Sequence, residues 1–173
     1  AFINFCEHEF SIATENSGGS NPLDLVKNYN QIYEAKKKSD YVIVVVHGGH
    51  EHYELPTLRM KETYRFFVEA GADVVINHHQ HCFSGYEIHN KKPIFYGLGN
   101  FCFDNKKYRD NIWNDGFMVE LIFANSKISF QLHPYIQSNK SPQVLPLEGE
   151  LLKKFKSKLS VLNKIIDENN TLD

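Results

Sequence analysis

The sequence lacks several features that would assign it to a broad class of protein. It has no run of about 18 consecutive apolar residues, so no segment is long enough to cross a membrane as a helix. Lysine and arginine total 19 against 21 acidic residues, so there is no basic excess of the kind that nucleic-acid-binding domains carry. Its three cysteines show no CxxC spacing, which argues against a disulfide framework and against a cysteine zinc site.

The first residues also lack an initiator methionine and a targeting segment. Residues 1–5 are instead mostly apolar, and we predict that they form a strand. Removal of a leader would explain such a start, but we favour a C-terminal portion of a longer protein. We assign residues 1–147 to part of one domain and residues 148–173 to a C-terminal amphipathic helix and its tail.

The apolar residues that are present follow strand and helix patterns in alternation. Residues 41–46 form a β-branched run without alternation, which is typical of a strand covered on both faces. A helix after Pro56 and a short apolar strand at 73–76 follow, and this β–α–β order predicts parallel strands in an α/β (α+β) fold. The expected buried stripe of that helix consists of Met60, Tyr64, Phe67 and Val68.

The remaining elements lie on either side of this unit. An earlier helix is expected to begin at Asn21-Pro22, with Asn21 as its N-cap. The later elements are expected to be strands at 86–89 and 93–96, a hairpin of 117–123 with 128–135 around Asn125-Ser126, and an amphipathic helix at about 150–167. Between the hairpin and the last helix we predict a loop from Ser138 onward.

Histidine is abundant, and six of the nine histidines fall in two windows that each follow an apolar strand. The windows are His47-Gly-Gly-His-Glu-His52 and His78-His-Gln-His81. Imidazole is a common ligand of zinc, manganese and iron, and open α/β sheets bind ligands at the carboxyl ends of their strands. Residues i and i+2 of an extended segment point the same way. We therefore predict a metal site of His47, His79 and His81, with His78 as the alternative ligand if the register differs by one.

Other polar residues near these windows have more than one interpretation. Glu51 is a general base, a carboxylate that orients a ligand histidine, or an exposed residue without a role. His50 is a substrate-facing catalytic residue or a surface residue. Asn100 lies among glycines at a strand end, near the site or in a simple turn. The isolated histidines are interpreted as solvated or hydrogen-bonded residues: His8, His89 and His133.

Three segments together carry a family resemblance. They are His47-Gly-Gly-His-Glu51, the stretch 70–81 (AGADVVINHHQH) and the stretch 93–101 (PIFYGLGNF). In order and spacing they resemble the bacterial capsule-synthesis protein family, the CapA-like proteins of poly-gamma-glutamate biosynthesis, whose pattern is approximately HWGxE, GADxVIGHHPH and PIxYSLGNF. The clear resemblance covers about residues 40–104.

The resemblance implies a fold like that of calcineurin-type metallophosphoesterases, a β-sandwich flanked by helices with a two-metal site. It matches His47 and Glu51 to HWGxE, and His79 and His81 to the last metal-ligating motif of the superfamily. Asn100 matches the asparagine of SLGNF. The implied cofactors are two divalent metal ions in the complete protein, with manganese, iron and zinc equally compatible.

Some features of the family pattern are missing or changed. The aspartate-rich motifs of the superfamily have no upstream counterpart here beyond Glu7, His8 and Glu9. We therefore expect the missing N-terminal portion of the same fold to supply those ligands, and this chain alone to hold metal weakly. Four positions depart from the pattern without removing a ligand: Gly48 for Trp, Asn77 for Gly, Gln80 for Pro and Gly97 for Ser.

Two classes of function agree with these residues. One is a metal-dependent hydrolase, in which two cations roughly 3.5–4 Å apart activate a water molecule and His50 stabilises the leaving group. Its substrate would be a phosphoester or an amide of a glutamate polymer. The other is a non-catalytic component that binds or assembles the capsule polymer. The resemblance suggests a cell-envelope or extracytoplasmic location for either.

Overall fold

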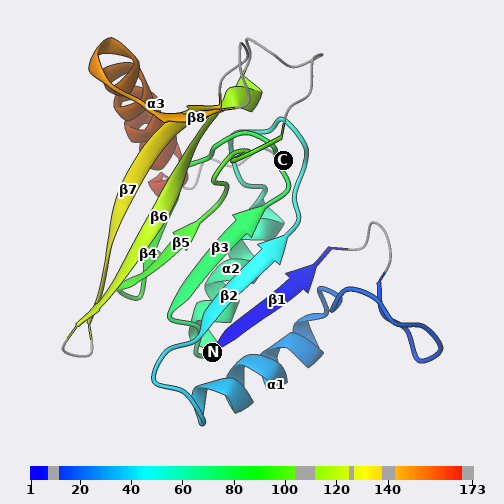
Figure 1. Ribbon diagram of the computed structural model, residues 1–173. Coiled ribbons are helices and arrows are strands. Elements are labelled where there is room, and N and C mark those ends of the chain that lie inside the picture. The colour runs from blue at the N-terminus through cyan, green and yellow to red at the C-terminus, as the bar shows by residue number, and fades with distance from the viewer. Residues whose placement is uncertain (8–11, 104–111, 125–126, 138–142, 169–173) are drawn as a thin grey trace.

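The computed structural model describes residues 1–7, 12–103, 112–124, 127–137 and 143–168. In chain order its elements are β1 (Phe2–Cys6), α1 (Leu25–Lys36), β2 (Ile43–His47), α2 (Leu58–Glu69), β3 (Val74–His78), β4 (Tyr86–His89), β5 (Lys92–Phe95), the 3-10 helix η2 (Ile112–Asn114), β6 (Asp115–Ala124), β7 (Lys127–Gln137), β8 (Val144–Pro146) and α3 (Gly149–Asp167). One sheet has the order β1-β2-β3-β5-β4 and a second has the order β6-β7-β8 (Figure 1). The predicted α/β class is confirmed.

The five-stranded sheet is mainly parallel. Strands β1, β2 and β3 run parallel in register, so that Cys6 lies opposite His47 and His47 lies opposite His78. Strand β5 joins β3 in parallel, and β4 closes that edge as an antiparallel strand. Because β2 lies between two neighbours and is covered on both faces, its apolar run needs no alternation. The carboxyl ends of the parallel strands therefore lie side by side.

Two hydrophobic cores cover the two faces of this sheet. Alternate residues of β2 divide between them, since successive strand side chains point to opposite faces. Val44 packs with Phe67 of α2 in the first core. Ile43 packs with Phe117 of β6 and Phe155 of α3 in the second. Burial of each such large side chain contributes roughly 1.5–3 kcal/mol, so both faces hold the sheet in place.

Helix α1 begins later than the sequence predicted. Its N-cap is Asp24, whose Oδ1 accepts hydrogen bonds from the backbone N–H groups of Val26 and Lys27, both at 3.1 Å. Asn21 instead extends the pairing of β1, because its carbonyl accepts the Cys6 N–H at 2.8 Å. The prediction of Asn21 as the cap was wrong because this strand contact competes with the local capping signal.

The stretch predicted as loop before the last helix contains β8. This short strand pairs with β7, and Pro146 lies opposite Tyr135. A proline is tolerated at the edge of a sheet, where its missing N–H breaks no ladder bond. Several predictions fall outside the described residues, namely His8, the turn at Asn125-Ser126 and the tail at 169–173. Among the described residues, no helix is long and apolar enough to span a membrane.

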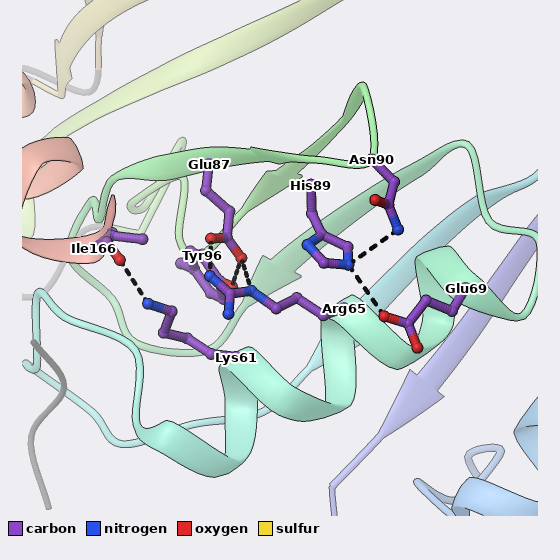
Figure 2. Close-up of polar contacts among 8 residues, drawn as sticks. All are labelled: Lys61, Arg65, Glu69, Glu87, His89, Asn90, Tyr96 and Ile166. Atoms are coloured by element: carbon purple, nitrogen blue, oxygen red, sulfur yellow. Dashed lines mark hydrogen bonds and ion pairs between the residues drawn. The ribbon is translucent and has the colours of Figure 1, made fainter. Parts of the chain in front are cut away.

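A buried polar network joins α2 to β4, β5 and α3 (Figure 2). Arg65 donates to both carboxylate oxygens of Glu87, at 2.9 and 2.6 Å, and the Tyr96 hydroxyl donates to the same carboxylate at 2.6 Å. Burial alone would raise the pKa of Glu87, but these hydrogen bonds outweigh it and lower that pKa. Lys61, only 1% exposed, donates to the Ile166 carbonyl of α3 at 2.5 Å.

Candidate metal centre

The two histidine windows meet at the carboxyl ends of β2 and β3. Backbone hydrogen bonds hold the following loops together, from Gly48 N–H to the His78 carbonyl at 3.0 Å and from His52 N–H to the Gln80 carbonyl at 2.7 Å. A cavity of about 490 Å³ lies beside these loops. Its histidines are the four that the sequence singled out as candidate metal ligands: His47, His78, His79 and His81. Apolar side chains from residues 101–103 and from β6 also line it.

Three side chains in this region have the spacing of a metal-binding set. The ligand atoms of Glu51, His79 and His81 all lie within 4.8 Å of one another. Glu51 Oε1 is 3.9 Å from His81 Nε2. Two ligand atoms that are each about 2.1 Å from a metal lie at most about 4.2 Å apart, so small side-chain movements bring the set to coordination distance. The His47 ring lies 4.7 Å from the His79 ring, next to this set.

Asn100 determines which nitrogen of His81 is available. The Asn100 Nδ2 group donates to the carbonyls of His81 and Trp113, at 3.1 and 3.2 Å. Its Oδ1 must therefore face His81 Nδ1, 2.8 Å away, and accept a hydrogen bond from its N–H. The neutral His81 ring then carries its lone pair on Nε2, the nitrogen that faces Glu51. A histidine fixed in this way by a hydrogen bond on its other nitrogen is typical of metal ligands.

The backbone of this region adopts unusual conformations. His52, His79 and His81 have φ angles of 66°, 106° and 57°. Positive φ is uncommon for residues other than glycine, and such conformations concentrate at functional sites. The sequence argument assumed an extended segment for His79 and His81, and this assumption was wrong. Their rings nevertheless lie 5.8 Å apart, because both residues turn through the left-handed region.

Trp113 is a member of the site that the sequence did not indicate. Its ring stacks on His81 at 4.4 Å and 23°, and it lies 5.5 Å from the His52 ring. The indole N–H donates to the Phe103 carbonyl at 3.1 Å. Trp113 is 4% exposed, so it shields one face of His81 from water. Its distance along the chain from both windows left no local signal for this contact.

His50 lies apart from the Glu51, His79 and His81 set. It contributes to a second cavity of about 540 Å³, together with Glu7, Arg59 and Tyr64. The Glu7 carboxylate accepts the Gly49 N–H at 2.7 Å. The structure thus does not bring His50, predicted as catalytic, into the cavity lined by His47, His78, His79 and His81.

The remaining histidines follow simpler patterns. His78 is exposed overall. Desolvation of part of its ring, followed by repulsion from His47, nevertheless lowers its pKa. His89 contacts Glu69 at 3.2 Å and His133 contacts Glu120 at 2.8 Å. Neither of these last two histidines lines the cavity.

The fold and this site describe an α/β protein with a histidine-rich cavity at the ends of parallel strands. The sequence model described as bacterial capsule synthesis protein PGA_cap matches residues 4–105, more than half of the chain. The chain therefore belongs to this family.

Named relatives agree with the assignment. The PGA biosynthesis protein CapA of Bacillus subtilis (strain 168) is 40% identical over 92 residues, which cover 53% of this chain and 24% of the relative. The capsule biosynthesis protein CapA of Bacillus anthracis is 37% identical over 98 residues, which cover 54% and 24%. The uncharacterized protein y4sH of Sinorhizobium fredii is 35% identical over 89 residues, which cover 50% and 19%. The matched part of this chain thus spans about a quarter or less of these curated relatives.

Proposed function

We propose that this chain carries part of a metal-dependent hydrolase site of the phosphoesterase type that serves capsule biosynthesis. The observation that carries the proposal is the convergence of Glu51, His79 and His81 within 4.8 Å. The Asn100 contact supports it, because in the neutral His81 ring it places the lone pair on Nε2, the nitrogen that faces that set.

The donor atoms fit a divalent cation. His79 and His81 would bind it through imidazole nitrogens and Glu51 through a carboxylate oxygen, a set that suits zinc, manganese and iron. When bound, such a cation polarises a substrate oxygen and lowers the pKa of a coordinated water molecule. His47, adjacent to His79, is the next candidate ligand.

The protein's own side chains would then orient and shield the reacting groups. Asn100 holds the His81 ring in one orientation, and Trp113 covers one face of that ring. Phe101 and Phe103 present exposed rings on the cavity wall, where they would contact an uncharged part of a substrate. Glu51 is exposed and could accept a proton from water if it is not a ligand.

The family and the names of the relatives point to the biological setting. Both Bacillus relatives carry names that refer to capsule or PGA biosynthesis. We extend this setting to the chain, with the capsule polymer or a phosphoester as its substrate. The remaining portion of the same fold is the partner that we expect to add further metal ligands.

Metal content is the first test. The protein is purified metal-free and titrated with zinc and manganese, and bound metal is measured by elemental analysis. We expect metal to bind, and His79→Ala and His81→Ala to abolish its binding. The matched control is His133→Ala, which removes an exposed histidine outside the cavity and should bind metal like the wild type.

Hydrolysis of a chromogenic phosphodiester by the same samples tests the reaction. Activity that is lost in His79→Ala and His81→Ala but kept in His133→Ala supports the hydrolase. Bound metal without hydrolysis would instead favour a non-catalytic component that binds or assembles the polymer. Absence of metal binding in the wild type would overturn the proposed site.

A further inference from the structure

One buried amide connects the elements that carry the histidine windows. Asn77 is 0% exposed and directly precedes His78 in β3. Its Nδ2 group has two hydrogens and lies within hydrogen-bond distance of three acceptors, so that one hydrogen is shared: the Gly48 carbonyl at 2.9 Å, the Tyr96 carbonyl at 3.1 Å and Gln80 Oε1 at 2.8 Å. Its Oδ1 accepts the Tyr64 hydroxyl at 2.6 Å. Asn77 therefore contacts α2, the loop after β2, the end of β5 and the second histidine window.

These contacts fix the orientation of both amides. The carbonyls of Gly48 and Tyr96 can only accept, so the Asn77 amide must present its NH₂ group to them. Gln80 must then present its oxygen to the same NH₂ group. The Gln80 Nε2 atom is consequently held in a buried position, without a hydrogen-bond partner among the described residues. Gln80 also lines the histidine cavity, so this buried donor belongs to the cavity wall.

Gly97 completes the arrangement from the other side. A Cβ atom at position 97 would lie 2.6 Å from Gln80 Oε1 and 3.2 Å from the Cys82 carbonyl. Glycine is therefore required for Gln80 to adopt its observed position. Asn77, Gln80 and Gly97 are three of the four departures from the family pattern noted above, and in the structure they form one contact cluster.

The position of Gln80 connects this cluster to the candidate metal ligands. Gln80 lies between His79 and His81, and both of these residues adopt positive φ angles. Strained conformations of this kind persist only where surrounding contacts over-determine them. Asn77 supplies such a contact to Gln80 and, through the Gly48 carbonyl, another to the residue that follows His47.

We propose that Asn77 is a positioning residue of the candidate metal centre. Together with Gln80 and Gly97, it holds the two histidine windows at a fixed separation and keeps His79 and His81 in their left-handed conformations. The role rests on the proposed metal site, but Asn77 itself contacts neither metal nor substrate. It acts through Gly48 and Gln80, which are the chain neighbours of the ligand residues.

The test compares Asn77→Ala with Asn28→Ala. Asn28 is also 0% exposed and makes comparable hydrogen bonds, to the Asp24 N–H at 2.9 Å and the Pro22 carbonyl at 3.1 Å, but it lies in α1 and lines neither cavity. Both variants should unfold at a lower temperature. Only Asn77→Ala should lower zinc affinity, by about 10- to 100-fold as for other residues that orient metal ligands.

A second readout needs no metal. Imidazole ¹⁵N resonances of the metal-free protein report the surroundings of His47, His79 and His81. We expect these resonances to shift or broaden in Asn77→Ala and to keep their wild-type positions in Asn28→Ala. Wild-type resonances and wild-type zinc affinity in Asn77→Ala would overturn the positioning role and leave Asn77 a structural residue only.

Gly97 offers an independent variant in case Asn77→Ala does not fold. Gly97→Ala should shift the same resonances, because its methyl group displaces Gln80. In a Gln80→Ala background the added methyl group should have a smaller effect, since its nearest obstacle is gone and only the 3.2 Å contacts with the Cys82 carbonyl and Ser84 Cβ remain. Gly18→Ala is the control, because no atom lies within 4 Å of its Cβ position. Equal effects of Gly97→Ala in both backgrounds would contradict the proposal.

The two proposals fail in different ways. If the wild type binds no zinc but its histidine resonances respond to Asn77→Ala, the metal site is wrong and the positioning of the histidines stands. If zinc binds and depends on His79 and His81 but not on Asn77, the metal site stands and the positioning role is wrong.

Discussion

Two polar regions lie near the end of β5, and their carboxylates differ in the hydrogen bonds that they accept. In the network around Glu87, the carboxylate has direct hydrogen bonds from Arg65 and Tyr96 (Figure 2). At the histidine loops, Glu51 and His81 lie 3.9 Å apart, too far for a hydrogen bond and close enough to share a cation. The first arrangement is complete within the protein, whereas we propose that a bound cation completes the second.

Tyr96 belongs to both regions, which makes the comparison testable. Its hydroxyl donates to Glu87, and its backbone carbonyl accepts from Asn77. If the two regions have different roles, substitutions in the network should reduce stability, and substitutions around the cavity should reduce metal affinity.

The largest expected effect on stability comes from Glu87→Ala. This change leaves the buried Tyr96 hydroxyl without its acceptor and Arg65 without its carboxylate. Breaking a buried pair costs about 3–5 kcal/mol, and we expect a value near the lower end because the Arg65 side chain is 31% exposed. Urea unfolding measures the loss. Glu120→Ala, which removes an exposed partner of His133, should cost less than about 1 kcal/mol. Equal costs would contradict the assignment.

Acid should also lower the stability of the protein. Asp73 resembles Glu87, because burial would raise its pKa but hydrogen bonds from Lys36, Lys92 and the Val42 N–H lower it. A carboxyl with a lowered folded-state pKa stabilises the protein above its unfolded-state pKa. That stability is lost as the pH falls through the folded-state pKa. The free energy of unfolding should therefore fall below about pH 4, near the unperturbed values. In Asp73→Asn this dependence should be shallower, whereas an unchanged slope would exclude Asp73 as a cause.

Asn100→Ala should affect the other region. Without the Asn100 oxygen the His81 ring loses its fixed tautomer, and metal affinity should fall by about 10- to 100-fold. Calorimetric titration with zinc measures the change, and Asn28→Ala serves as the control. Wild-type affinity in Asn100→Ala would show that the His81 tautomer does not depend on this contact.

The smallest effect is expected for His50→Ala. This exposed residue lines the second cavity with Glu7, and it lies outside the Glu51, His79 and His81 set. Zinc affinity should change by no more than about twofold, in keeping with an exposed substitution. A tenfold loss would place His50 among the ligands and extend the site into the second cavity.

Patterns within one segment were sufficient to predict much of this fold. The apolar run of β2 and the stripe Met60, Tyr64, Phe67 and Val68 of α2 depend on burial, which leaves a periodic trace in the sequence. The ends of two parallel strands likewise place two histidine windows together without further information. These features are predictable because neighbouring residues share one physical environment.

Contacts between distant segments were not predictable in the same way. Neither the stacking of Trp113 on His81 nor the hydrogen bond between Asn77 and Gln80 leaves a periodic signal. The positive φ angles of His79 and His81 likewise leave no signal in the sequence, since surrounding contacts hold them and the residue type does not. The cap of α1 was misplaced because Asn21 and Asp24 are both good caps, and the strand contact of Asn21 decides between them.

The contact between Lys61 and the Ile166 carbonyl has a consequence for the order in which the protein can fold. The two residues are 105 positions apart, and the lysine is buried by this contact. During synthesis, α2 is complete long before the last turn of α3 leaves the ribosome. Until then Lys61 lacks the carbonyl that accepts its hydrogen bond, and Ile166 is missing from the first core. Contacts of such long separation slow folding, so the central sheet should reach its final stability only after α3 has been synthesised and has packed against α2.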